Sequence, residues 1–123
     1  INLRMSELNA LLTFAVIKES EFIIQKKYGI AEQYIDACKE YGWEYIEPQS
    51  NGQRSNLYKF ILLSRSENPK KELSPITKRT SPVYDYFLGR DNNEITKRHI
   101  CLPIWYLLEE ETVGIVVSEL KRL

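Results

Sequence analysis

The sequence predicts an α+β fold, with helices in the first third of the chain and short strands after them. Apolar residues recur at helical spacing near the amino terminus, and two segments rich in aromatic and aliphatic residues then flank a polar turn. The chain has 123 residues, of which 43% are hydrophobic and 28% are charged, as in an ordinary globular protein. This length is typical of one domain with a single core.

Three helices are predicted in the first third. Ser6 offers an N-cap for a helix over 6–18, and Ser20 offers one for a short helix over 21–28. Gly29 is expected to end that short helix because glycine readily adopts a positive φ, and Gly42 is expected to end a third helix over 31–41 in the same way. The first helix carries a single apolar stripe, which we expect to face the core: Leu8, Leu11, Leu12, Ala15 and Val16.

A hairpin is predicted after the helices. Residues 43–47 alternate apolar with charged side chains, and residues 57–64 form a dense run of aromatic and aliphatic ones, so both segments are typical of strands. The polar stretch 48–56 between them is centred on Asn51-Gly52, the dipeptide that most strongly favours a tight hairpin turn. We therefore expect a hairpin with a long polar tip.

The second half of the chain is harder to interpret. Residues 65–82 contain three prolines and five basic side chains without a hydrophobic period, which predicts a linker or a basic surface arm. Residues 99–108 fit either a strand interrupted by Pro103 or a helix that begins there. The last apolar residues fit helical spacing, although 115–117 has strand character, and they could pack on the core or pair with a second copy: Val113, Val116, Val117, Leu120 and Leu123.

Charge is unevenly distributed along a chain whose net charge is zero. Residues 1–47 carry five basic and eight acidic side chains, and residues 109–123 carry two basic and four acidic ones. Residues 48–108 carry ten basic and five acidic side chains, so this middle part is the one that would contact a polyanion.

Several classes of protein are not favoured by the sequence. No stretch approaches the roughly 18 consecutive apolar residues of a membrane span, and the first residues lack the pattern of a secretory signal. Cys38 and Cys101 lie far apart and outside metal-type spacing, so we expect two buried free thiols in a cytoplasmic, soluble protein without a membrane partner.

The order of helix, short helix, glycine turn, helix and hairpin resembles the winged helix-turn-helix family. Apolar residues flank the turn glycine at the spacings of that family: Ile24 and Tyr28 before Gly29, and Ile30, Ile35 and Cys38 after it. Gln25 and Ala31 depart from it, because the family usually has a small residue and a Ser or Thr cap at these two positions.

This resemblance covers residues 6–64 and implies three helices with a β-hairpin wing. Residues 1–64 would then form the winged-helix domain, residues 65–82 a basic arm, and residues 83–123 a C-terminal extension for packing or dimerisation. The implied function is a non-enzymatic DNA-binding protein, a transcriptional regulator or a replication accessory protein, with duplex DNA as its partner and without a cofactor.

The predicted third helix is acidic at Glu32, Asp36 and Glu40, and DNA phosphates repel such a helix. Basic and amide side chains elsewhere would have to contact the phosphates and the bases. The expected nucleic-acid-binding residues are Lys26, Lys27, Gln33, Asn51, Gln53, Arg54, Lys59, Lys70 and Lys71.

Two alternatives stay open. The winged-helix scaffold could serve as a protein-protein interaction module, because eight Tyr and two Trp supply the aromatic anchors that interfaces favour. A metal-dependent nuclease component could place Glu119 and Lys121 on one face of a strand, with Asp85 or Asp91 as the upstream metal ligand. His99 has no second histidine or carboxylate at ligand spacing, so we assign no catalytic residue and no metal ligand.

Overall fold

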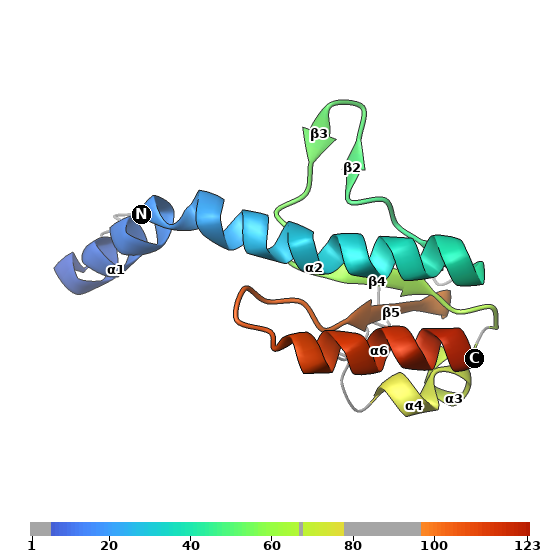
Figure 1. Cartoon of the computed structure of the whole chain (residues 1–123). Coiled ribbons are helices and arrows are strands. Elements are labelled where there is room, and N and C mark those ends of the chain that lie inside the picture. Colours follow the sequence, from blue (N-terminus) through green and yellow to red (C-terminus); the bar gives the residue numbers. More distant parts are fainter. Residues whose placement is uncertain (1–5, 67, 78–96) are drawn as a thin grey trace.

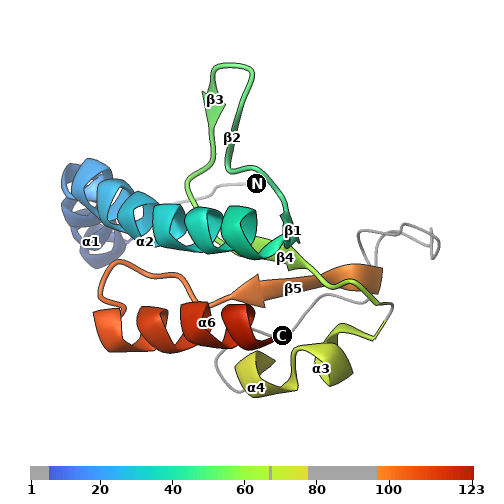
Figure 2. The same ribbon diagram turned by 45° about the vertical axis from the view of Figure 1, so that its right-hand side comes forward.

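The computed structural model describes residues 6–66, 68–77 and 97–123 and confirms an α+β fold. Two long helices pack together in front of a small antiparallel sheet, and a hairpin projects above them (Figures 1 and 2). The elements in chain order are α1 (Glu7–Lys18), α2 (Ser20–Tyr41), β1 (Glu44–Tyr45), β2 (Gln49–Ser50), β3 (Gln53–Arg54), β4 (Phe60–Leu63), α3 (Pro69–Glu72), α4 (Ser74–Thr77), β5 (His99–Leu102) and α6 (Glu110–Arg122).

The first predicted helix is confirmed as α1. The Ser6 hydroxyl accepts a hydrogen bond from the backbone N–H of Asn9 at 3.2 Å and so caps the helix as expected. The prediction that its apolar stripe faces the core is wrong, because none of its residues is buried. Figure 1 shows the helix extending away from the sheet, beyond the end of the two packed helices.

The prediction of two helices separated by a turn at Gly29 is wrong. Residues 20–41 form the single helix α2, and positive φ is found at Gly42 and Gly52 but not at Gly29. Gly42 ends α2 in the left-handed conformation with φ of 71°, as the sequence predicts. The helix-turn-helix geometry that the resemblance implies is therefore absent from this part of the chain.

Burial explains why α2 continues through Gly29. Contacts hold α2 on both sides of Gly29: Tyr28 just before it packs partly buried against the core and hydrogen-bonds to the base of the hairpin, and Ile30 and Ala31 just after it are buried. A glycine in a helix interior costs about 1 kcal/mol relative to alanine. Burying one large apolar side chain contributes roughly 1.5–3 kcal/mol, so this packing outweighs the local preference of the glycine.

The sheet has the strand order β1-β4-β5 with antiparallel pairing throughout. Its register pairs Phe60 with Leu102 and Leu62 with Ile100, and these four side chains belong to the hydrophobic core that α2 and α6 cover. The predicted strand pairing of 43–47 with 57–64 is confirmed in β1 and β4. Strand β5 ends before Pro103, which resolves the ambiguity over 99–108 in favour of a strand.

The tip of the hairpin also follows the sequence. Strands β2 and β3 pair across Asn51 and Gly52, whose φ angles of 50° and 75° are those of a type I′ turn. The base of the tip is held to α2, because the Tyr28 hydroxyl lies 3.2 Å from the Pro48 carbonyl oxygen and 3.0 Å from that of Ser55. The projecting hairpin in Figure 1 is thus fixed at its base.

Residues after position 64 share the core of the earlier ones. The predicted apolar spacing near the end of the chain forms α6, whose Val113, Val116 and Leu120 are buried in the same hydrophobic core as α2. The sequence predicts a linker or a basic surface arm over 65–82, but residues 68–77 contain α3 and α4, with Leu73 and Ile76 buried in the core. Residues 78–82 of that arm lie outside the described residues, as does the segment 83–96.

Arg65 joins the carboxyl ends of the two long helices. Its guanidinium lies 3.8 Å from the centre of the Trp43 ring and donates hydrogen bonds to the carbonyl oxygens of Tyr41 and Leu123. The Trp43 indole N–H donates to the Leu120 carbonyl oxygen at 2.9 Å. These contacts satisfy carbonyl groups that would otherwise lack partners at the helix ends.

Within the described ranges, none of the helices has the length and apolar character required to cross a membrane.

Replacing Gly29 by alanine tests the continuity of α2. A Cβ at Gly29 meets no atom within 4 Å. Alanine is the better helix former, so we expect Gly29→Ala to raise the free energy of unfolding by about 0.5–1 kcal/mol. Gly42→Ala is the matched control, because a side chain there has to adopt positive φ, and it should lower this free energy by about 1–2 kcal/mol. Urea denaturation measures both, and equal destabilisation by the two variants would mean that Gly29 lies in a turn.

Candidate functional site

A groove of about 390 Å³ lies between the first half of α2 and the segment that leads from β5 into α6. Its apolar floor includes Ile30, Leu108 and Val113, all of which are buried. Polar and charged side chains line it as well. The full lining is Phe22, Gln25, Lys26, Gly29, Ile30, Gln33, Tyr106, Leu108, Glu110 and Val113.

Helical periodicity brings one wall of the groove together. Phe22, Gln25, Gly29 and Gln33 recur at spacings of three or four along α2, so they lie on the same face of the helix. The opposite wall comes from the turn after β5, in which the Leu108 N–H donates to the Trp105 carbonyl oxygen at 3.1 Å. Gly29 also lines the groove, and a Cβ at this position would meet no atom within 4 Å.

The chemistry of the groove suits an apolar group surrounded by hydrogen-bonding partners. The amides of Gln25 and Gln33 both donate and accept, Lys26 donates, and the Glu110 carboxylate accepts. The lining side chains contain no serine, cysteine or histidine that could act as a nucleophile beside a base. Within the described residues, no group of three or more histidine, cysteine, aspartate or glutamate side chains could hold a metal ion.

The predicted nucleic-acid-binding residues of α2 are separated by the structure. Lys26 and Gln33 line the groove, and the Lys26 ammonium lies 5.7 Å from the centre of the Phe22 ring. Lys27 is half-buried and does not line the groove. The predicted residues therefore do not form one continuous basic surface along this helix.

The predicted residues of the hairpin lie on the other side of α2. Asn51 is at the exposed turn and Gln53 is on β3. Arg54 contacts α2: its guanidinium lies 3.2 Å from the Glu21 carboxylate and 5.0 Å from the centre of the Tyr28 ring. Its charge is already matched by Glu21, so Arg54 holds the hairpin against α2.

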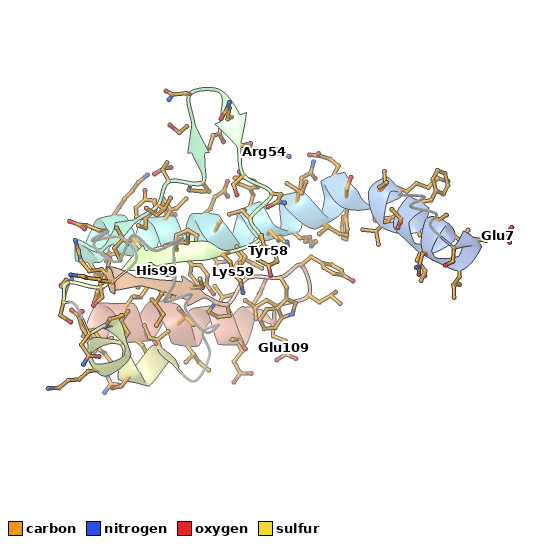
Figure 3. All side chains as sticks on the ribbon, turned by 180° about the vertical axis from the view of Figure 1, so that it is seen from behind. Glu7, Arg54, Tyr58, Lys59, His99 and Glu109 are labelled. Atoms are coloured by element: carbon orange, nitrogen blue, oxygen red, sulfur yellow. The ribbon has the colours of Figure 1, made fainter. Side chains whose placement is uncertain are left out.

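The remaining predicted residues are dispersed. Figure 3 shows Arg54 on the hairpin and Tyr58 and Lys59 nearer the sheet, and the Lys59 ammonium lies 5.1 Å from the centre of the Tyr58 ring. Lys70 and Lys71 belong to α3, which lies on the far side of α6 from the hairpin (Figures 1 and 2). The structure does not bring α3 and the hairpin onto a shared surface.

The expected recognition helix is the second half of α2, and its inner face is buried in the core. The face left exposed carries Glu32, Asp36 and Glu40, which phosphate repels. The nuclease alternative fails on secondary structure, because Glu119 and Lys121 lie on helix α6, where residues two apart point to different sides. Glu119 instead pairs with Arg122 at 2.9 Å, and Asp85 and Asp91 lie outside the described residues.

Buried titratable groups belong to the core. Both cysteines are free and buried, as predicted. Burial raises the pKa of the Cys38 thiol from its ordinary value of 9.0 to about 12. Burial also raises the pKa of Cys101, and the positive charge of Lys59 opposes that shift. Neither thiol has the lowered pKa of a reactive cysteine.

Sequence reasoning missed most of the groove. Phe22, Gln25, Tyr106, Leu108 and Glu110 were not among the predicted site residues, since the two walls are about eighty positions apart in the chain. In a continuous α2, the spacing of Phe22, Gln25, Gly29 and Gln33 indicates that these four residues share one face of the helix. The opposite wall has no local signal in the sequence.

No protein-family model matches the chain, and no curated protein matches it. Solved structures of aminotransferases share its fold. One is PseC from Helicobacter pylori, an aminotransferase involved in the biosynthesis of pseudoaminic acid: the TM-score is 0.75 at 20% identity, over 99% of this chain and 38% of that chain. Another is the aminotransferase TlmJ from Streptoalloteichus hindustanus, with a TM-score of 0.68 at 16% identity, over 85% of this chain and 32% of that chain.

The chain spans about a third of the length of these two structures. At this level of identity the similarity establishes the fold. The prediction of a DNA-binding regulator is wrong, because the solved structures that share the fold are aminotransferases. The alternatives of a winged-helix interaction module and a nuclease component are set aside on the same finding.

The buried thiols predict a loss of stability at alkaline pH. Below pH 9 the Cys38 thiol is neutral in both the folded and the unfolded chain, so it adds no pH dependence. Between pH 9 and about 12 it ionises only in the unfolded chain. The free energy of unfolding should then fall by up to about 1.4 kcal/mol per pH unit for each such group.

Urea denaturation at pH 8, 9, 10 and 11 measures this slope, with pH as the only variable. Cys38→Ala should make it shallower, whereas Ser50→Ala at the exposed hairpin should leave it unchanged. A slope that Cys38→Ala does not alter would contradict the burial of this thiol.

Proposed function

We propose that the chain is one domain of a larger aminotransferase. The observation that carries the proposal is the similarity to the PseC structure, which extends over 99% of the chain at a TM-score of 0.75. The whole arrangement of long helices, three-stranded sheet and connecting segments takes part in this similarity. A likeness confined to two helices or one hairpin would be far less specific.

The surface of the chain supports a place within a larger protein. Trp105, Tyr106 and Leu107 are consecutive and exposed beside the groove, and α1 exposes large apolar side chains along its whole length. Soluble proteins rarely expose contiguous apolar surface unless it is a binding site or an interface. A domain that spans about a third of its structural neighbours has such interfaces with the rest of the protein.

Transamination is carried out by pyridoxal phosphate, which enzymes hold through a lysine Schiff base and which serves as an electron sink for the substrate. The described residues do not fit this cofactor by themselves. Their lysines with a described side chain are exposed or half-buried, and Lys26, which lines the groove, is exposed and lies over the Phe22 ring. In this proposal the cofactor is held by other parts of the protein, and no step of the reaction is assigned to the residues that the structure describes.

The role that suits this domain is to form one wall of the substrate cleft. Ligand pockets occur preferentially at the interfaces between domains. The groove is open, and it combines an apolar floor with amide and charged groups on the same end of the molecule as the exposed 105–107 segment. Such a wall contacts the substrate, while the cofactor and the groups that react with it belong to other parts of the protein.

Amino-group transfer by the full-length polypeptide tests the proposal. The protein is purified, supplemented with pyridoxal phosphate and incubated with each standard amino acid, and mass spectrometry follows conversion to the corresponding 2-oxo acid. At least one amino acid should be converted in an amount close to that of the protein even without an acceptor, since the amino group stays on the enzyme. Absence of conversion with every amino acid would contradict the proposal.

A further inference from the structure

We propose that α1 is a docking arm that inserts into an apolar cleft formed by the rest of the same polypeptide. This inference rests on the proposed function in one respect, namely that the chain belongs to a longer protein. Beyond the proposed function, it names the contact that holds this domain to the rest of the polypeptide. The contact is made by a helix that this domain leaves almost wholly uncovered.

The apolar residues of α1 surround the helix. Leu11, Phe14 and Ile17 are 66%, 56% and 62% exposed, and Leu8, Leu12 and Val16 are exposed as well. Successive residues of an α-helix turn by about 100°, so these six side chains spread over most of its circumference. Between Leu8 and Ile17, Asn9 and Thr13 mark the narrow polar strip that remains. The charged Glu7 and Lys18 lie at the two ends of the helix, and the Lys18 ammonium is 4.9 Å from the centre of the Phe14 ring. A helix that is apolar on nearly all sides is normally buried on nearly all sides.

The distribution of these side chains distinguishes between two surfaces that could cover α1: a second copy of α1 and a cleft in the rest of the polypeptide. A second copy of α1 would cover one stripe, as in a coiled coil, and would leave the opposite side in water. Phe14 and Val16 are two residues apart and therefore point to nearly opposite sides of the helix. Both are exposed here, so an occupant that covers the two together has to surround the helix. A cleft in a folded polypeptide does so.

The similar PseC structure is long enough to contain such a cleft outside the part that matches this chain. The match to the PseC structure covers 99% of this chain, so it reaches into α1, and it leaves 62% of that chain outside the matched part, the complement of the 38% covered. In Figure 3 the label of Glu7 marks the outer end of α1, far from the hairpin at Arg54 and from Glu109 at the start of α6. The arm thus has no partner among the described elements beyond the start of α2.

The apolar surface continues from α1 to the groove. Phe22, on the first turn of α2, is 51% exposed and lines the groove. Tyr106 forms part of the facing wall, with Trp105 and Leu107 exposed beside it. Figures 1 and 2 both show α1 and the segment before α6 at the same end of the molecule. One cleft in the rest of the polypeptide can therefore cover α1 and also border the groove.

Thiol accessibility in the full-length polypeptide tests the proposal. Phe14→Cys and Val16→Cys place a thiol on each of two opposite sides of α1, and the native Cys38 and Cys101 are buried, so they add little background. The rate of modification by a maleimide is measured in the native protein and in urea for each variant. Gln53→Cys, on the exposed hairpin, is the control that shows the reagent reaching a surface site, and the unsubstituted protein gives the background of any other cysteines.

Both α1 thiols are expected to react at least about tenfold more slowly in the native protein than in urea, equivalent to about 1.4 kcal/mol of opening free energy. This protection should not change with protein concentration. Protection of only one side, or protection lost on dilution, would overturn the proposal in favour of a second copy. Native rates equal to those in urea at both positions would overturn it as well.

The amino-transfer assay on the same preparations separates this inference from the proposed function. An active protein with freely reactive α1 thiols would refute the docking arm alone. An inactive protein with both thiols protected would refute the aminotransferase and leave the arm in place.

Discussion

The hydroxyl of Tyr34 donates a 2.9 Å hydrogen bond to the carbonyl oxygen of Pro103, and its ring packs edge-on against Phe60 at a centroid distance of 5.4 Å. The Tyr34 side chain is fully buried. Three segments meet at this residue: α2, the first residue of β4 and the chain just after β5. A buried polar group has to find a partner, so the hydroxyl fixes how α2 lies over the sheet. It also fixes where the chain leaves β5, and hence where α6 begins.

Both the groove and the exposed arm follow from this constraint. Because α2 is held over the sheet by its second half, its first half runs past the end of the packed layer and faces the segment 105–110 across the groove. Helix α1 continues still further and has no core beneath it. In the function proposed above, this exposed side of the domain is the one that the rest of the longer protein covers.

Local signals in the sequence were reliable where a few neighbouring residues decide the structure. Ser6 caps α1, Gly42 ends α2, Asn51-Gly52 forms the hairpin turn, and the spacing of Val113, Val116 and Leu120 makes α6 amphipathic.

The same local signals failed where contacts between distant residues determine the structure. Gly29 is a helix terminator only by local preference, and packing on both sides of it, by Tyr28 before and by Ile30 and Tyr34 after, overrides that preference. In α1 the predicted stripe did not include Phe14 and Ile17, which make the helix apolar on its other side as well. The function was mistaken for the same reason, since the helix-turn-helix interpretation depended on a break at Gly29.

Amide hydrogen exchange, followed residue by residue on this chain, tests most directly whether a single core holds α2, the sheet and α6 together. If one core holds these elements, the amides of 30–41 in α2 and 113–120 in α6 exchange at one common free energy. Gly29 and Ile30 then exchange no faster than their places in a continuous helix allow. Rapid exchange confined to residues 29–31, or opening of α6 while the second half of α2 stays protected, would contradict it.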